Sequence, residues 1–574
     1  MRVLVLLASA AFLACGDDGQ TSSTDSGSGS GGGGSGSGAA AGSSGTAGGD
    51  QGGSGGHAPA SIVEPGDPGP GDVTFTVRAD QDVRPISPLI YGINWSGELD
   101  GEQRGATVLR MGGNRLTAYN WENNASNAGS DWMHQNDAHL VGDSPRGDVP
   151  GEAVRMQAEA ALAHGAAFIA TVPICGYVAA DKDGGGDVNQ TPNYLQTRFH
   201  PTFARKGAPF SSSPDLEDHA VYQDEFVAWM KQAFPDAFQG ETANILFSLD
   251  NEPDLWSYTH ERIHPDPVTY AELVDKNIEF ASAIKDVAPN ALVTGFVSYG
   301  YGGYMSLQGA PDADGNFIEH YLDAMKDAEA SEGRRLVDVL DLHWYTEVYA
   351  NGERITGNDS SPESIAARVQ APRSLWDPTY VEDSWIANDV LQGPIQLIPW
   401  LQGLIDAHYP GTDIGFTEYN YGGGADISGA IAQADVLGIF GREGVRLASI
   451  WDWSEEAVMT RAGMRAFTSY DGQGGRFGDT SVRAETSDVA KATVYASIGE
   501  ADPSRMVLVA INKTTAPLTA TVRLAAYGSY TAVDVWQLTA AEADLVPADP
   551  VAPSATNAFT YAMPALSVSV LVPR

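Results

Sequence analysis

The sequence predicts an α/β protein: a TIM-like (β/α)8 barrel with an additional β-sandwich domain formed by both chain ends. Short apolar runs alternate with longer amphipathic segments through the middle of the 574 residues, which is the pattern of βα units. Eight such runs are present, as a closed barrel needs. Beyond about Val482 only short strand-like runs follow, and one alternating run at residues 73–77 precedes the barrel.

The eight expected barrel strands are short apolar runs, most of which end on polar or aromatic side chains. They are residues 89–94, 108–111, 167–172, 245–249, 291–297, 339–343, 414–418 and 447–453. Helical periodicity is clearest at residues 151–164, 220–234, 268–287 and 427–442. A doubly wound sheet is the alternative fold, but it would leave several polar strand ends without a common opening.

The amino-terminal residues 1–15 predict a lipoprotein-type signal peptide. Arg2 precedes an apolar stretch that is too short to span a membrane. Residues 12–16 (FLACG) look like a bacterial lipoprotein cleavage site, at which Cys15 would become the lipidated first residue. Phe12 stands where that motif usually has leucine, so plain secretion is the alternative. We therefore expect an exported protein, lipid-anchored at the bacterial cell envelope or otherwise secreted.

The remaining chain is expected to form four parts. Residues 16–72 are rich in Gly, Ser, Thr and acidic residues, and too poor in apolar groups to fold, so they predict a disordered tether. Residues 73–88 would supply the N-terminal strand of the β-sandwich, residues 89–481 the catalytic barrel, and residues 482–574 the C-terminal β-sandwich.

The acidic composition limits the classes of partner. The net charge of −41, from 33 basic and 74 acidic residues, argues against nucleic acid and against docking on anionic lipid through a basic face. A neutral polymer is a compatible substrate, although acidity also keeps an exported protein soluble. With Cys15 acylated, Cys175 has no partner for an intramolecular disulfide. We expect a monomer that contacts a membrane only through its N-terminal lipid.

Two glutamates at strand ends are the candidate catalytic pair. Because Pro253 cannot donate to a β-ladder, the strand before it must end and expose Asn251 and Glu252 at its carboxyl end. Glu418 ends a second apolar run. Two carboxylates at strand ends are the minimum for glycoside hydrolysis. We expect Glu252 to be the general acid/base and Glu418 the nucleophile, about 5 to 5.5 Å apart, as retention of configuration requires.

Other polar strand ends predict substrate-binding and supporting roles. Asn251 would bond the sugar 2-hydroxyl or brace Glu252. Arg110 and Tyr345 would orient Glu418, although Arg110 is equally consistent with a structural salt bridge. His343 would bond either carboxylate, or be an ordinary core histidine.

Aromatic side chains near the strand ends are candidate platforms for sugar stacking, with plain core packing as the alternative. They are Trp95, Trp256, Trp344 and Trp451.

One loop resembles a calcium-binding turn. Asp181, Asp183 and Asp187 alternate with glycines and a lysine, but the distal glutamate of an EF-hand is missing, so a solvated turn is favoured and any calcium would be structural. The sequence has no Cys/His cluster with zinc spacing and no serine elbow. We therefore expect no cofactor for catalysis.

Several long motifs resemble glycoside hydrolase family 44. They are residues 110–117 (RMGGNRLT), 119–132 (YNWENNASNAGSDW), 248–256 with 259–260 and 262–265, 341–345 (DLHWY) and 415–421. The resemblance runs from about Val73 to the carboxyl terminus. It implies a TIM-like barrel with a β-sandwich from both chain ends, which cuts internal β-1,4-glucan bonds with retention. It also places Glu252 on the family's acid/base position and Glu418 on its nucleophile position.

The resemblance implies a polysaccharide substrate of the β-glucan class. Family members act on soluble cellulose derivatives and often on xyloglucan, and some act on xylan or mannan. A bound calcium ion is also implied, without matching its ligands to residues of this chain. A β-mannanase or xylanase of the same clan is the alternative enzyme. A non-catalytic surface glycan-binding lipoprotein is the alternative from another class, against which the intact Glu252 and Glu418 argue.

Overall fold

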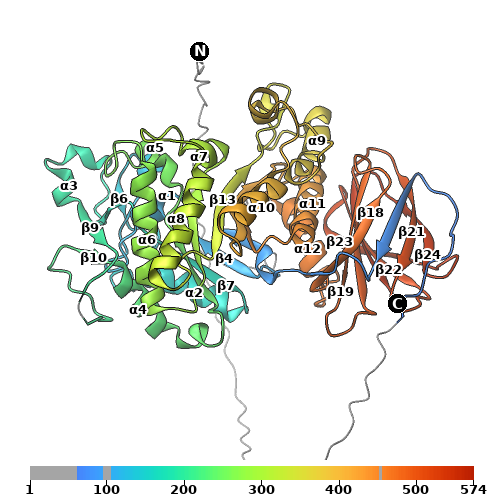
Figure 1. Ribbon diagram of the computed structural model, residues 1–574, viewed down its shortest axis with the longest axis horizontal. Helices are drawn as coiled ribbons and strands as arrows, with labels where there is room; N and C mark the ends of the chain where they lie inside the picture. The colour runs from blue at the N-terminus through green and yellow to red at the C-terminus, as the bar shows by residue number, and fades with distance from the viewer. Residues whose placement is uncertain (1–60, 95–104, 208, 452–455) are drawn as a thin grey trace, which may run out of the picture. The chain divides into compact units, whose positions relative to one another are not determined.

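A closed barrel of eight parallel strands forms the centre of the chain. The computed structural model describes residues 61–94, 105–207, 209–451 and 456–574 (Figure 1). The barrel strands are β3 (Gly92–Asn94), β4 (Val108–Met111), β7 (Ala167–Val172), β11 (Ile245–Leu249), β12 (Val293–Ser298), β13 (Val339–Tyr345), β16 (Asp413–Asn420) and β17 (Leu447–Ile450). They pair in the closed order β11-β12-β13-β16-β17-β3-β4-β7. This confirms the predicted barrel, because each predicted run overlaps one of the strands.

The barrel strands are continuous apolar runs because both of their faces are buried. One face forms a cluster inside the barrel with Val108, Ile169, Leu246 and Val339 among its members. The alternating residues, such as Phe168, pack outward in the large core shared with the helices. The polar residues at the carboxyl ends of the strands are therefore the side chains that stand above a filled barrel.

Helices follow seven of the strands, and the segment after β3 lies largely outside the described residues. The helices are α2 (Glu152–Ala163), α4 (Gln223–Ala233), α6 (Tyr270–Val287), α8 (Phe317–Glu332), α10 (Leu397–His408), α11 (Ile427–Glu443) and α12 (Val458–Thr468). Their ends follow from capping residues: Thr269 accepts from the N–H of Glu272 at the start of α6, and Gly444 ends α11 with a φ of 79°.

Shorter elements occur in the loops that connect strands and helices. The short helices are α1 (Asn114–Thr117), α3 (Tyr194–Thr197), α5 (Trp256–Thr259), α7 (Tyr301–Ser306) and α9 (Pro362–Arg368). The short strands are β5 (Ser126–Asn127), β6 (Asn136–Asp137), β8 (Tyr177–Ala179), β9 (Phe199–Phe203), β10 (Val221–Tyr222), β14 (Tyr349–Ala350) and β15 (Glu353–Arg354). None of the described helices is long and apolar enough to cross a membrane.

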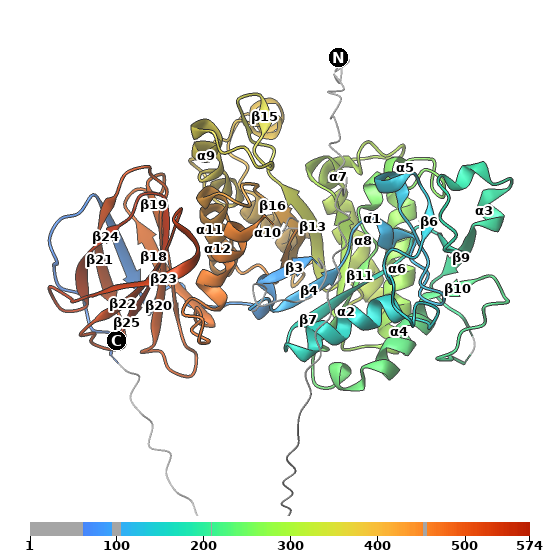
Figure 2. The same cartoon turned by 180° about the vertical axis from the view of Figure 1, so that it is seen from behind.

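The β-sandwich contains strands from both ends of the chain. Its strands are β1 (Val73–Arg78), β2 (Arg84–Pro85), β18 (Thr480–Thr486), β19 (Ala492–Ile498), β20 (Met506–Asn512), β21 (Leu518–Ala525), β22 (Val533–Thr539), β23 (Glu542–Val551), β24 (Ala558–Met563) and β25 (Ser567–Pro573). β1 pairs parallel with β21 and antiparallel with β18. The blue N-terminal strand therefore lies among orange and red C-terminal strands (Figure 2).

β18 joins the two sheets of the sandwich. Its residues 480–482 pair with β19, and its residues 483–486 pair with β1. Phe75, Val522 and Phe559 are among the residues that fill the core between the sheets. The strand thus changes sheets halfway along its length, as strands at the corners of a sandwich do.

The sheet that contains β20 is buried on both faces. Leu508 and Ala510 belong to the core of the sandwich, whereas Val509 and Ile511 belong to the core of the barrel. α11 contacts β19, β20 and β25. This double burial explains why the sequence of β20 is uniformly apolar instead of alternating.

A buried ion pair joins α11 to the sandwich. The side chains of Asp435 and Lys513 are 1% and 0% exposed, with 2.6 Å between Asp435 Oδ2 and Lys513 Nζ. Asp435 Oδ1 also accepts from the hydroxyl groups of Thr493 and Tyr495, each at 2.7 Å. Burial lowers the pKa of Lys513, and the charge of Asp435 opposes that effect. The carboxylate is therefore the group that permits an ammonium ion in this interface.

We expect Asp435→Ala to lower the free energy of unfolding by about 3 to 5 kcal/mol, because the Lys513 ammonium would remain buried without a counter-charge. Chemical denaturation followed by circular dichroism measures this. The matched control is Asp534→Ala, which removes a half-exposed ion pair with Arg574 and should cost less than about 1 kcal/mol. Equal losses in the two variants would contradict the prediction.

Candidate active site

The residues after β11 adopt an unusual backbone that turns Glu252 out of the strand. Asp250 and Glu252 have φ angles of 68° and 46°, in the left-handed region that non-glycine residues rarely occupy. Pro253 then begins the 3-10 helix η6 (Pro253–Leu255). The strand ends here, as the proline predicts, and Asn251 and Glu252 lie at its carboxyl end.

Asp250 holds this turn in place. Its carboxylate, 0% exposed, accepts from donors in three segments of the chain. They are the Thr117 hydroxyl at 2.6 Å, the N–H groups of Ile174 at 2.6 Å, Cys175 at 3.1 Å and Asn251 at 2.8 Å, and the Trp256 indole N–H at 3.2 Å. Burial raises the pKa of Asp250, and these donors oppose that effect. A carboxylate with this many donors offsets the cost of two left-handed residues.

The neighbouring strand supplies a second constraint on Glu252. The backbone N–H of Glu252 donates to the carbonyl of Val297 at 2.9 Å. Val297 itself has a φ of 63°, which is a clear outlier for a β-branched residue. The bulge between Phe296 and Ser298 in the pairing of β12 with β13 coincides with this residue. The irregular end of β12 therefore presents the acceptor that fixes the main chain of Glu252.

Glu418 lies in β16 as half of a buried ion pair. Arg110 Nη1 donates to Glu418 Oε1 at 2.7 Å, and the Tyr345 hydroxyl donates to Oε2 at 2.8 Å. The side chains of Arg110 and Glu418 are 0% and 6% exposed. Both oxygens therefore accept from donors, and a buried cation balances the negative charge.

Arg110 also fixes the amides that flank the pair. Its Nη1 donates to Asn94 Oδ1 at 3.0 Å, and its Nη2 donates to Asn251 Oδ1 at 2.8 Å. A Cβ atom at Gly112 would overlap the guanidinium group, so only glycine fits at this position of the RMGG motif. The predicted orienting role of Arg110 thus has a geometric basis in three strands, β3, β4 and β16.

His343 lies between the two glutamates. Its Nδ1 is 2.8 Å from Glu252 Oε1 and 3.5 Å from Glu418 Oε2. Burial lowers the pKa of His343 to about 4, so the ring is neutral at neutral pH. One ring nitrogen must then donate and the other accept.

The surroundings of His343 indicate which nitrogen carries the proton. The Thr417 hydroxyl donates to the Asp341 carboxylate at 2.8 Å, which leaves its lone pairs facing His343 Nε2 at 3.4 Å. This arrangement fits a proton on Nε2. Nδ1 is then an acceptor, and the carboxyl O–H of Glu252 is the donor that faces it. The network therefore favours a protonated Glu252.

Burial gives Glu252 the proton affinity of a general acid. Burial raises the pKa of Glu252 to about 7, with a smaller contribution from Asp131 in the same direction and an opposing one from Arg110. The nearest carboxylate oxygens of Glu252 and Glu418 lie within 4.8 Å of one another. One acid with a raised pKa and one carboxylate in an ion pair thus lie close together at the carboxyl ends of the barrel strands.

The predicted aromatic platforms have different outcomes. Trp256 is 0% exposed and donates to Asp250, and Trp344 is 3% exposed and donates to the Tyr421 hydroxyl at 3.2 Å. Both belong to the hydrophobic core, and this burial weighs against the prediction that they stack on sugar. Trp451 is half-buried, and its ring lies against Gly113 beside the site, so its role stays a prediction. Trp95 lies outside the described residues.

The aspartates of the predicted calcium turn form ion pairs with arginines. Asp181 accepts from Arg198 at 2.6 and 2.8 Å, and Asp187 accepts from Arg262 at 2.7 and 3.0 Å. Arginine pairing competes with a bound cation at these two carboxylates. Metal binding by Asp181, Asp183 and Asp187 stays a prediction, and these pairs weigh against it.

The sequence reasoning missed the acids that support the site. Asp250 and Asp341 are each 0% exposed and accept from residues of other strands and loops. Each is a charged residue within or beside an otherwise apolar run, and that is the signal that could have identified them.

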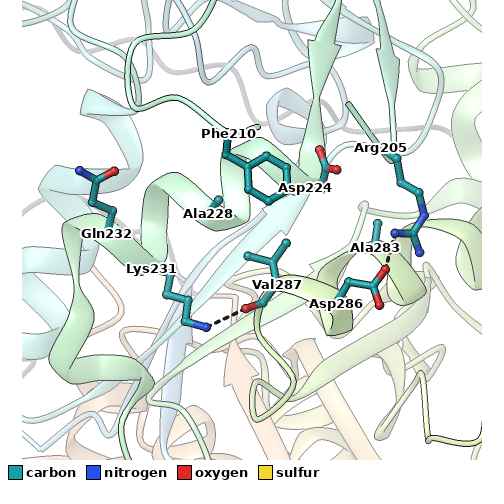
Figure 3. A pocket seen from close by; sticks show the side chains of 9 residues that line it. All are labelled: Arg205, Phe210, Asp224, Ala228, Lys231, Gln232, Ala283, Asp286 and Val287. Carbon is teal, nitrogen blue, oxygen red and sulfur yellow. Dashed lines mark hydrogen bonds and ion pairs between the residues drawn. The ribbon is translucent and has the colours of Figure 1, made fainter. Parts of the chain in front are cut away.

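A cavity of about 580 Å³ lies on the outside of the barrel between α4 and α6 (Figure 3). Its charged groups are already paired: Arg205 donates to Asp286, and Lys231 donates to the carbonyl of Val287 at 2.8 Å. None of the candidate catalytic residues lines it. The candidate site is therefore the group of residues at the strand ends and not this cavity.

Comparison with known proteins identifies the family. The family model of glycoside hydrolase family 44 matches residues 125–348. Endoglucanase A of Paenibacillus lautus is 42% identical over 516 residues, which cover 87% of this chain and 72% of that protein.

Solved structures of the same family share the fold. A family 44 xyloglucanase from Paenibacillus polymyxa, solved with xyloglucan, has a TM-score of 0.83 and 39% identity over 87% of this chain and 99% of that chain. A family 44 endoglucanase from Clostridium thermocellum has a TM-score of 0.83 and 42% identity over 88% of this chain and 100% of that chain. The chain therefore belongs to glycoside hydrolase family 44.

Proposed function

We propose that this glycoside hydrolase cleaves internal β-1,4-glucosidic bonds of cellulose-type glucans, and of xyloglucan, with retention of configuration. The observation that supports this best is the carboxyl pair within 4.8 Å, in which Glu252 faces a neutral His343 and Glu418 forms an ion pair with Arg110. In the first step Glu418 attacks the anomeric carbon while Glu252 gives its proton to the departing glycosidic oxygen. In the second, Glu252 takes a proton from water, which displaces Glu418.

The separation of the carboxyl groups favours retention over inversion. A retaining enzyme holds them about 5 to 5.5 Å apart, whereas an inverting enzyme needs about 6.5 to 9.5 Å to fit a water molecule. The nearest oxygens of Glu252 and Glu418 lie within 4.8 Å of one another, which is nearer to the retaining spacing.

Asn251 is suited to bind the sugar beside the scissile bond. Its Oδ1 accepts from Arg110 Nη2 and from the Gly113 N–H at 3.2 Å, which fixes the orientation of the amide. These bonds leave the NH2 group of Asn251 unused within the described residues, so it can donate to the 2-hydroxyl of the sugar.

The substrate class follows from the relatives. Their names describe endoglucanases and a xyloglucanase, so β-1,4-glucans are the proposed substrates of this chain. A β-mannanase or xylanase is the runner-up enzyme, and product analysis on glucan, xyloglucan, mannan and xylan separates these activities. A non-catalytic binder would release no product from any of them.

We extend the proposal to cofactors and to the location of the protein. Catalysis needs no cofactor, and any calcium would be structural. We also propose that the protein is exported and anchored at the cell envelope through Cys15, or secreted if that residue is not lipidated.

We expect Glu252→Gln and Glu418→Gln each to lower kcat on carboxymethylcellulose or xyloglucan by about 10²-fold to 10⁴-fold or more, because each removes a group that reacts in the transition state. Release of reducing sugar measures this. Asp534→Asn is the control: it should keep kcat within a few-fold, since Asp534 lies in β22 of the sandwich, where it pairs with Arg574. Full activity of either glutamine variant would sink the proposed mechanism.

The pH dependence should report the proton on Glu252. We expect kcat/KM to fall as the pH rises through about 7, because the acid form of Glu252 exists below its pKa and is lost above it. With an aryl glycoside whose leaving group needs no proton, Glu252→Gln should lack this alkaline limb. A limb that persists in that variant belongs to another group.

Retention itself is visible in the first product formed. Proton NMR at early times should show the β-anomer at the new reducing end, with the α-anomer appearing only by mutarotation. Initial formation of the α-anomer would mean inversion and exclude a covalent intermediate on Glu418.

A further inference from the structure

A further buried carboxylate, Asp254, follows Glu252 by two residues and has no part in the proposed steps. It belongs to η6 and is 4% exposed. The Ser298 hydroxyl donates to Asp254 Oδ2 at 2.5 Å, and the Tyr299 N–H lies 3.3 Å from both of its oxygens. Since Ser298 ends β12, Asp254 connects η6 to the neighbouring barrel strand.

The contacts between Asp254 and β12 lie next to the hydrogen bond that holds Glu252. The N–H of Glu252 donates to Val297, and the Asp254 carboxylate accepts from the next two residues, Ser298 and Tyr299. Pro253 fixes φ between the two contacts. The main chain that carries the acid/base is therefore held on both sides by the irregular end of β12.

The fold reserves space for this carboxylate. A Cβ atom at Gly303 in α7 would overlap both Asp254 Oδ2 and the Ser298 hydroxyl. Any larger side chain at Gly303 would displace the carboxylate from its donors. The Asp254 contact is thus built by three separate segments of the chain.

The charges around the two acids make them interdependent. Burial raises the pKa of Asp254 to about 7, with the charge of Glu252 adding to it and the Ser298 hydroxyl opposing. An ionised Glu252 therefore favours the proton on Asp254. The other ionisable groups that face Glu252 are Arg110, Asp131, His343, Tyr345 and Glu418, and those that face Asp254 are Tyr299 and Tyr304.

We propose that Asp254 is a positioning residue for the acid/base: it fixes the main chain of Glu252 through Ser298 and Tyr299. This inference rests on the proposed acid/base role of Glu252. Asp254 does not touch the substrate, so its effect should appear in kcat and not in KM.

The test compares the neutral variant Asp254→Asn with the truncated variant Asp254→Ala in the full-length protein. The asparagine oxygen can still accept a hydrogen bond but carries no charge. We expect KM on xyloglucan to be unchanged in both variants. At a pH where Glu252 is protonated in every variant, Asp254→Asn should keep most of its kcat, and Asp254→Ala should lose about tenfold or more.

Asp338 offers a matched control at the opposite end of the same strand. It accepts from Lys285 at 2.7 Å and from the N–H of Val293, the first residue of β12, at 2.8 Å. Asp338→Ala removes a carboxylate contact from the other end of the strand, so kcat should stay within a few-fold of the wild-type value. An equal loss of kcat in Asp254→Ala and Asp338→Ala would mean a general loss of stability and overturn the proposal.

The remaining outcomes each decide the question. An unchanged kcat in a folded Asp254→Ala, or a change confined to KM, would overturn the inference. If Asp254→Ala does not fold, Asp254→Ser provides a small polar side chain with the same expected loss of kcat. If neither folds, Asp254 is a structural residue and the proposal fails. Glu252→Gln tests the proposed function separately: high activity there would refute the acid/base role itself, whereas low activity of Glu252→Gln with full activity of Asp254→Ala would refute only the role of Asp254.

Discussion

Two carboxyl groups within 4.8 Å can act as acid and nucleophile only if they carry different charges, and much of the site maintains that difference. Arg110 and Tyr345 donate to Glu418 and not to Glu252. Glu252 instead faces a histidine that burial keeps neutral. The buried Asp341 extends this asymmetry through Thr417 to His343. The different roles of the two glutamates therefore follow from the different groups that surround each of them.

The main chain at the ends of β11 and β12 also holds Glu252 in place. Asp250, Glu252 and Val297 all adopt left-handed conformations within this small region. Each such residue costs free energy of the order of 1 kcal/mol or more, and buried hydrogen bonds to Asp250 offset part of that cost. Strain of this kind persists where the surrounding fold leaves no alternative, which is the case between two strands of a closed barrel.

Local patterns in the sequence predicted what depends on local causes. Each barrel strand could be located because a strand buried on both faces is apolar throughout, and Pro253 marked the end of β11. The burial of Trp256 and Trp344 could not be predicted, because their indole donors are satisfied by Asp250 and Tyr421 only after folding. Asp250 was missed for the same reason: its donors come from segments far apart in the chain, and no local pattern shows them.

The position of β1 has a consequence for biosynthesis. Thr74 donates to the hydroxyl of Ser487, 413 residues further along, and β1 pairs along its whole length with β21. During translation this first strand emerges from the ribosome long before its partners exist, and it must stay unpaired while the barrel is synthesised. Its alternating threonines and arginine give the strand one polar face, which limits self-association before its partner strands are synthesised. A stalled or truncated nascent chain would thus expose β1, and it would be a target for chaperones and proteases.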